Sequence, residues 1–199
     1  MKNLFEFFVE VDKLKRTYRY STRDSAIQDS VADHSWKLAM MVIFTTKELD
    51  LEINILHAIK LALCHDIQEY IAGEIDARRI HREEFSKEKK FELEKNAIEE
   101  IKEKFGKIGE EIKELWEEFE EGKTKEAKYV NALDKIEAIS HLLSVERVEK
   151  FDMDYTAVCA NESVKNFPEL KPLLKEVQMK LKKECEKIGE VWKAEYELD

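Results

Sequence analysis

Turn-forming residues are scarce in this sequence. Its 199 residues include only two prolines and five glycines. Stretches in which β-branched or aromatic residues alternate with polar ones, the pattern of a half-buried strand, are hard to find, whereas charged residues, mostly glutamate and lysine, make up 39 % of the chain. The sequence therefore predicts an all-α fold. No linker-like tract or internal repeat interrupts it, so we expect a single domain over residues 1–199.

Cysteine and long apolar runs are also rare. The three cysteines, Cys64, Cys159 and Cys185, are far apart and form no Cys-x-x-Cys pair, so neither a zinc knuckle nor a disulfide framework is indicated. The first residues lack the apolar run of a signal peptide, and no later run approaches the length of a membrane span. We expect a cytoplasmic protein outside the membrane.

Positive charge is in deficit, with a formal net charge of -10 and a pI of about 5.2. A broad nucleic-acid-binding surface is therefore disfavoured. The first 25 residues are locally basic, with Lys13, Lys15, Arg16, Arg19 and Arg23 closely spaced. That excess could contact one anionic small molecule, although composition alone favours a solvated helix and loop.

Apolar residues at helical spacing predict helices over 3–16, 31–49, 53–71, 85–104, 107–121, 124–149 and 172–196. Ser30 and Thr124 are typical N-caps for two of these helices. Residues 17–29 read as a loop in which two aromatic residues alternate with two arginines, and residues 74–84 read as a charged connection. Arginine can bind phosphate in a forked geometry, so the first loop is a candidate binding segment.

The most informative stretch runs from Leu61 to Glu74. It begins as an apolar helix and ends in ionisable residues, with His65 and Asp66 adjacent and Glu69 at i+4 from the histidine. This spacing places His65 and Glu69 near one face of a helix. Ionisable side chains on a buried helix are costly unless they are paired, hydrogen-bonded or bound to metal, so the stretch predicts a site.

Two further polar residues interrupt apolar helices. His34 lies in the first turn of the second predicted helix, and Asp134 lies between Leu133 and Ile136. Alone, His34 is better explained as a core or capping residue, and Asp134 as an exposed or salt-bridged one. Together with the His65–Asp66 pair they form a mixed nitrogen and oxygen donor set suited to Mn, Co, Ni, Fe or Zn. Such an ion could activate water, which a nearby carboxylate could position.

The order His34…His65-Asp66…Asp134 resembles the H…HD…D signature of HD-domain metal-dependent phosphohydrolases. Flanking segments are similar to the small 5'-deoxynucleotidases of the YfbR and HDDC2 types. The similar segments are 14–17, 29–34, 61–66, 114–119 and 126–134. The resemblance implies an HD-domain helical bundle with a metal-binding core at about 14–150 and C-terminal helices at 151–199.

The resemblance also implies roles for individual residues. The positions that match metal ligands are His34, His65, Asp66 and Asp134, and Glu69 matches the glutamate that acts on the nucleophilic water, which gives Asp66 and Glu69 catalytic roles. The implied cofactor is one divalent ion, with Co²⁺, Mn²⁺, Mg²⁺, Ni²⁺, Fe²⁺ and Zn²⁺ as candidates.

Substrate contacts are implied for a second set. Arg19 and Tyr20 occupy the place of an Arg-Trp pair that contacts the nucleotide, and Arg23 is a candidate second phosphate ligand. Glu74 stands where the family has an aspartate that helps to select deoxyribose. The replacements of Trp by Tyr20 and of Asp by Glu74 leave sugar selectivity open, and Asp76 could take the same role.

The implied activity is hydrolysis of (deoxy)nucleoside 5'-monophosphates to nucleoside and phosphate by a homodimer. Two alternatives remain open from the sequence. One is an HD-domain hydrolase of another nucleotide or small phosphate ester, and the other is a non-catalytic helical module that binds metal or nucleotide.

Overall fold

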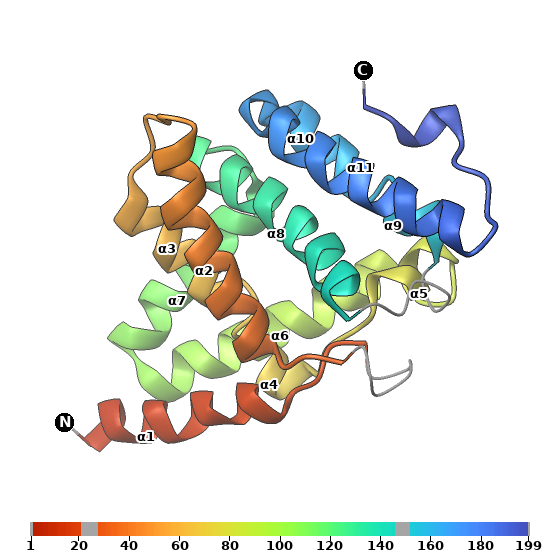
Figure 1. The fold of residues 1–199 in the computed structure, drawn as a ribbon. Helices are drawn as coiled ribbons and strands as arrows, with labels where there is room; N and C mark the ends of the chain where they lie inside the picture. Colours follow the sequence, from red (N-terminus) through yellow and green to blue (C-terminus); the bar gives the residue numbers. More distant parts are fainter. Residues whose placement is uncertain (1, 21–27, 146–151, 199) are drawn as a thin grey trace.

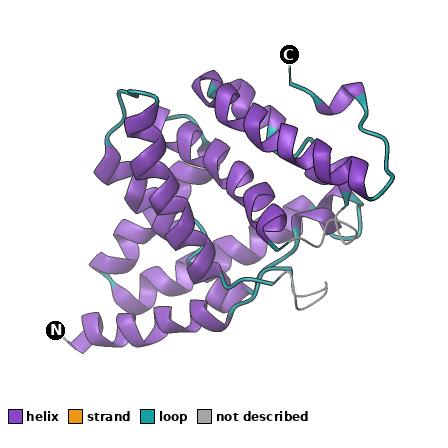
Figure 2. Cartoon of the chain, in the orientation of Figure 1, coloured by secondary structure: helices purple, strands orange, loops and turns teal. Residues whose placement is uncertain are grey.

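The computed structural model describes residues 2–20, 28–145 and 152–198, and within these ranges it contains helices and no β-strand (Figure 1, Figure 2). The predicted all-α fold is confirmed. The α-helices are α1 (Lys2–Val11), α2 (Val31–Glu48), α3 (Ile55–Cys64), α4 (Glu69–Ala72), α5 (Ala77–His81), α6 (Lys87–Phe105), α7 (Lys107–Glu121), α8 (Lys125–Ser144), α9 (Met153–Thr156), α10 (Asn161–Asn166) and α11 (Lys171–Lys187). Short 3₁₀ helices are η1 (Asp12–Arg16), η4 (Pro168–Leu170) and η5 (Ala194–Tyr196). None of the described helices is both long and apolar enough to cross a bilayer.

Helix α8 forms the centre of the bundle (Figure 1). It contacts α2, α3, α7, α10 and α11. Leu133, Ile136 and Ile139 are fully buried in the main apolar core, so α8 is covered on several sides. A polar residue on α8 is therefore placed inside the protein, where it needs a partner.

The helix predicted over 53–71 is wrong in its second half, because α3 ends at Cys64. Beyond it the backbone tightens: the amide of Ile67 donates to the carbonyl of Cys64, and the amide of Glu69 donates to the carbonyl of Asp66. These i→i−3 hydrogen bonds replace the α-helical pattern until α4 begins. The side chains after Cys64 thus leave α-helical register, and Glu69 is not one regular turn beyond His65.

The last predicted helix, over 172–196, is also too long. Helix α11 ends at Lys187, and Gly189 adopts a φ of +79° that favours glycine. The tail then folds back, so that the carbonyl oxygen of Tyr196 accepts a hydrogen bond of 2.8 Å from the Gln178 side chain. Trp192 continues the apolar spacing of α11, which is why the pattern alone predicts a longer helix.

The start of α2 has the predicted cap. Ser30 accepts a 3.0 Å hydrogen bond at Oγ from the amide of Asp33, and the Asp33 carboxylate accepts one of 3.2 Å from the amide of Ser30. This reciprocal capping box fixes the first turn of the helix. His34 is the next residue, so the cap also fixes its position.

We predict that Ser30→Ala lowers the free energy of unfolding by about 1–2 kcal/mol, because it removes the buried cap hydroxyl, which accepts from the Asp33 amide and donates to the Asp33 carboxylate. Chemical denaturation measures the change. Ser86→Ala is the matched control, since Ser86 caps α6 with one hydrogen bond at an exposed site. A loss no larger than that of the control would contradict the prediction.

Candidate active site

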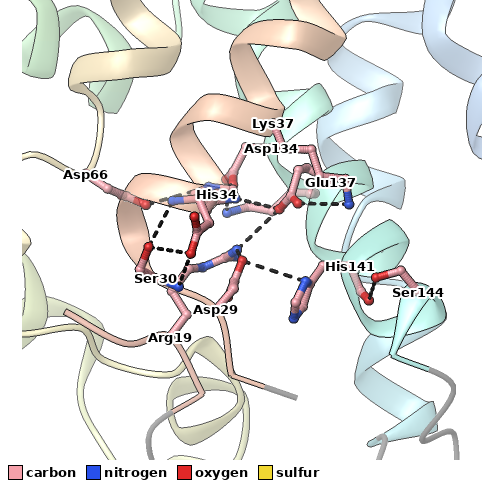
Figure 3. A network of polar contacts seen from close by, with 12 residues as sticks. Arg19, Asp29, Ser30, His34, Lys37, Asp66, Asp134, Glu137, His141 and Ser144 are labelled. Carbon is pink, nitrogen blue, oxygen red and sulfur yellow. Dashed lines mark hydrogen bonds and ion pairs between the residues drawn. The ribbon is translucent and has the colours of Figure 1, made fainter. Parts of the chain in front are cut away.

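The four predicted ligand side chains meet between α2, the turn after α3, and α8 (Figure 3 labels three of them). Asp134 Oδ1 lies 3.1 Å from His34 Nε2, and Asp66 Oδ2 lies 3.0 Å from His65 Nε2. The two Nε2 atoms are 3.3 Å apart. Residues separated by up to 100 positions in the sequence are therefore brought to one point.

Each imidazole is oriented by a contact at its Nδ1 nitrogen. Nδ1 of His34 lies 2.5 Å from Oε2 of Glu137, and Nδ1 of His65 lies 3.0 Å from the carbonyl oxygen of Ala62. When Nδ1 carries the proton and donates it to these acceptors, the Nε2 lone pairs are free for an ion. Both rings are buried, so they have little freedom to turn away.

The carboxylates in this cluster are held in the charged form. Burial opposes ionisation of Asp66, but the neighbouring imidazoles hold its pKa below the usual range. Burial likewise opposes ionisation of Asp134, and nearby cations hold its pKa well below the usual range. Burial lowers the pKa of His34, but its carboxylate neighbours outweigh this and raise it to about 9. The cluster thus has a strong negative potential that favours a cation.

This donor set fits a divalent transition-metal ion. The ligand atoms of His34, His65 and Asp66 all lie within 4.8 Å of one another, and Asp134 adds a second carboxylate beside the imidazoles. Two imidazole nitrogens with carboxylate oxygens are typical of sites for ions such as Fe²⁺, Co²⁺, Ni²⁺ and Zn²⁺. Three or four protein ligands would also leave room for water and substrate.

Glu69 is the first residue of α4 and is only 5 % exposed. Its Oε2 atom is buried and has no hydrogen-bond partner among the described residues. Burial, with Asp66 and Glu74 nearby, raises the pKa of Glu69 well above its usual value. A buried, unpaired carboxyl beside a cluster of candidate ligands is typical of a general base.

A cavity of about 150 Å³ lies beside these groups. Its walls include most of the residues that the sequence singles out: Arg19, Tyr20, His65, Asp66, Glu69, Glu74, Asp76 and Asp134. Arg23 lies outside the described residues. The structure thus brings four of the five predicted substrate residues and three of the four predicted ligands to one cavity.

Arg19 and Tyr20 are anchored to α8 and to their own loop. Nη1 of Arg19 lies 3.2 Å from Oε2 of Glu137 and 3.4 Å from Oδ2 of Asp29. Tyr20 has a φ of 58°, and its ring stacks on His141 with 5.8 Å between centroids. A left-handed conformation at a bulky residue is strained, and such strain is often stored at functional sites.

Glu74 and Asp76 differ in how their carboxylates are satisfied. Asp76 caps α5 and accepts hydrogen bonds from the amide of Arg78 at 2.9 Å and from its guanidinium at 3.0 and 3.2 Å. Oε2 of Glu74 is buried without a hydrogen-bond partner among the described residues. Burial, followed by repulsion from Asp76, raises the pKa of Glu74 to about 7. Glu74 is therefore the better candidate to hydrogen-bond a ligand.

Three charged residues of the site were not expected from the sequence. Glu137 lies behind His34, while Lys90 of α6 and Lys135 of α8 line the cavity. Lys135 Nζ lies 2.7 Å from Asp134 Oδ2. Lysines in charged helices are normally solvated, so the sequence holds no signal for these two. For Glu137 the signal is its place three residues after Asp134, on a helix with an apolar pattern.

We predict that Glu74→Gln stabilises the metal-free fold more at pH 8 than at pH 5. An acid with a raised folded pKa, here about 7 instead of 4.5, stabilises the fold below pH 4.5 and loses that contribution as the pH rises through 7. The ionised carboxylate then costs about 1–3 kcal/mol at pH 8. Urea unfolding with a chelator measures both gains, with exposed Glu114→Gln as the control. Equal gains at the two pH values would contradict the prediction.

Comparison with known proteins adds family membership to this geometry. The family model described as HD domain matches residues 11–173. A protein of Dictyostelium discoideum named 5'-deoxynucleotidase HDDC2 is 37 % identical over 155 residues, covering 74 % of this chain and 80 % of its own. The Xenopus laevis protein of the same name is 36 % identical over 152 residues, covering 75 % and 72 %.

A solved structure shows the same fold. A conserved hypothetical protein from Pyrococcus furiosus superposes with a TM-score of 0.70 at 24 % identity, covering 88 % of this chain and 99 % of its own. At that identity the likeness concerns the fold alone. Because the family model matches most of the sequence and the two relatives exceed 30 % identity, the chain belongs to the HD domain family.

Proposed function

We propose that this protein is a metal-dependent phosphomonoesterase that hydrolyses (deoxy)nucleoside 5'-monophosphates to nucleoside and inorganic phosphate. The names of its relatives, 5'-deoxynucleotidases at 36 and 37 % identity, support the substrate class. The observation that carries the proposal is the cluster of His34, His65, Asp66 and Asp134 beside the unpaired carboxyl of Glu69.

The ion would be held by His34, His65, Asp66 and Asp134. When bound, it would polarise a phosphate oxygen and lower the pKa of a water. The mixed donor set is compatible with Mn²⁺, Fe²⁺, Co²⁺, Ni²⁺ or Zn²⁺, and Mg²⁺ is the candidate that prefers more oxygen ligands. The choice among these ions in the cell depends on their availability as well as on the ligands.

Glu69 would position the attacking water and take its proton. In hydrolysis the water oxygen forms a bond to phosphorus, the bond from phosphorus to the 5' oxygen breaks, and the 5' oxygen leaves with a proton as the nucleoside hydroxyl. The buried Oε2 of Glu69 has no hydrogen-bond partner among the described residues, so it can accept the proton.

Arg19 would bind the phosphate. Its guanidinium is fixed by Glu137 and Asp29 at the edge of the cavity. Charge spreads over the phosphate oxygens in a loose transition state, and a fixed cation there lowers the barrier. Arg23 is a proposed second cation. A local cation of this kind allows a chain of net charge -10 to bind a dianion.

Tyr20 and Glu74 would contact the nucleoside. Tyr20 provides an aromatic surface at the cavity, and the unpaired oxygen of Glu74 can accept a hydrogen bond from a sugar hydroxyl. Asp76 is less suited to that role because Arg78 already occupies its carboxylate. We therefore assign recognition of the sugar to Glu74.

Phosphate release from paired substrates tests this function. Chelator-stripped protein is assayed on dAMP, AMP and the other dNMP and NMP pairs, with Co²⁺, Mn²⁺, Mg²⁺, Ni²⁺, Fe²⁺ or Zn²⁺ added back. Metal-dependent release that favours dNMP is expected. Equal release from both sugars would keep the chemistry and remove the deoxyribose preference. No release from any nucleotide with any metal would contradict the proposed activity.

We predict that Glu69→Ala lowers kcat by about 10²–10⁴-fold, because it removes the group that moves the proton. Metal content should stay at the wild-type level, since Glu69 is not among the proposed ligands. Steady-state kinetics and elemental analysis measure the two effects. Glu114→Gln, on the exposed face of α7, should change neither. Normal turnover in the Glu69 variant would show that the water role is misassigned.

We also propose that two copies associate through α2 and α3. These neighbouring helices expose apolar side chains: Trp36, Met40, Ile43 and Phe44 on α2, and Leu56 and Leu63 on α3. The α2 residues follow i, i+4, i+7, i+8 spacing and so form one stripe. Exposed apolar surface of this kind is typical of protein–protein contacts.

The expected state in light scattering is therefore a dimer. Trp36→Glu, at a side chain that is 63 % exposed, should shift the protein to monomer while leaving its helical content unchanged. Val191→Glu is the matched control, because Val191 is 80 % exposed in the C-terminal tail, away from α2 and α3. A monomeric wild-type protein would contradict the dimer.

A cytoplasmic location is proposed as well. The support is chemical: Cys64, Cys159 and Cys185 are all free thiols, which suits a reducing compartment. Burial raises the pKa of Cys64 to about 11 and that of Cys159 to about 12, so neither thiol is reactive at neutral pH.

A further inference from the structure

Glu137 is a fully buried carboxylate in the interior of α8 (Figure 3). It lies three residues after Asp134, so both residues fall on the same side of the helix. A buried carboxylate costs several kcal/mol unless cations or donors compensate it. Its partners therefore indicate why the position is occupied by glutamate.

Glu137 has three cationic or donor partners. Oε2 lies 2.5 Å from Nδ1 of His34 and 3.2 Å from Nη1 of Arg19, and Oε1 lies 3.2 Å from Nζ of Lys37. The carboxylate is thus fixed from several directions.

A single oxygen atom of Glu137 contacts both the metal-ligand candidate His34 and the proposed phosphate ligand Arg19. By accepting the Nδ1 proton of His34, Oε2 leaves the Nε2 lone pair directed at the candidate ion. The same Oε2 holds the guanidinium of Arg19, the proposed phosphate ligand. We infer that Glu137 is a positioning residue that couples the metal ligand His34 to the phosphate-binding Arg19. This inference rests on the proposed function.

The neighbouring face of α8 supports this role. His141 follows Glu137 by one helical turn, stacks on Tyr20, and has Nδ1 at 3.8 Å from Oδ2 of Asp29. Along α8, Asp134 therefore contacts the candidate metal site and Glu137 contacts Arg19. His141, one turn further, contacts Tyr20 and Asp29. A single rigid helix sets the distance between the ion and the groups that bind phosphate and nucleoside.

Metal affinity tests the contact between Glu137 and His34, and it is measured without turnover. Glu137→Gln keeps the size of the side chain and an acceptor for Nδ1 but removes the charge. Co²⁺ binding to chelator-stripped protein, followed by calorimetry and by the visible absorption of the bound ion, should weaken by about 10–100-fold. Unchanged Co²⁺ affinity would overturn the inference.

Glu118→Gln is the matched control for this variant. Glu118 also pairs with an imidazole, with Oε2 at 2.8 Å from Nε2 of His57, but this pair lies outside the cavity. The control should leave Co²⁺ affinity and kinetics at wild-type values. Circular dichroism and the thermal midpoint show that each variant is folded before it is measured.

A double-mutant cycle tests the contact between Glu137 and Arg19. Arg19→Ala alone should raise KM for dAMP and leave Co²⁺ affinity within twofold of wild type. Glu137→Gln should raise KM as well, because the guanidinium loses its anchor. If the two act as one unit, adding Arg19→Ala to the Glu137 variant raises KM by less than it does in the wild type. Independent, multiplicative effects on KM would overturn the coupling.

The two proposals fail in different ways. A wild-type protein that releases no phosphate from any nucleotide contradicts the proposed function, whatever Glu137 does. An active wild type whose Glu137→Gln variant binds Co²⁺ normally contradicts only the positioning role. Purely structural importance of Glu137 would appear as a lower thermal midpoint with unchanged Co²⁺ affinity and unchanged KM in the folded fraction.

Discussion

Charge compensation inside an apolar helical bundle is the constraint on which this site depends. Asp66, Glu69, Asp134 and Glu137 are carboxylates in or beside the core, and their desolvation opposes folding. Imidazole, guanidinium and ammonium groups compensate most of them, but Oε2 of Glu69 has no hydrogen-bond partner in the part of the chain that the structure describes. An added divalent cation would lower the remaining cost, so metal binding and folding are expected to reinforce each other.

Three parts of the fold hold the four candidate ligands. The capped first turn of α2 holds His34, the tightened turn after α3 holds His65 and Asp66, and α8 holds Asp134. Because α8 is packed on several sides, its polar residues have little freedom to move. Arg19 and Tyr20 contact Glu137 and His141 of α8, which fixes these two residues relative to the ligands.

Much of this arrangement follows from the sequence, and the failures have physical causes. Periodicity predicts α2, α6, α7 and α8 well because each is long and amphipathic or capped. It extends the helix of His65 too far, because tertiary hydrogen bonding and not local propensity decides where that helix tightens. The four ligand positions follow from the order of residue types, whereas Lys90 and Lys135 do not, since charged residues on a helix are usually solvated. Glu137 has only the weak signal of its spacing from Asp134. Only packing shows that these three point inward.

The most direct test of the central claim is a crystal structure of the Co²⁺-loaded protein with anomalous diffraction at the cobalt edge. The account predicts one strong peak about 2.0–2.3 Å from His34 Nε2, His65 Nε2 and carboxylate oxygens of Asp66 and Asp134. The ion should lie on the side of the cavity that Glu69 lines. A peak held by other residues, or no peak in a protein that shows metal-dependent phosphate release, would contradict the proposed site.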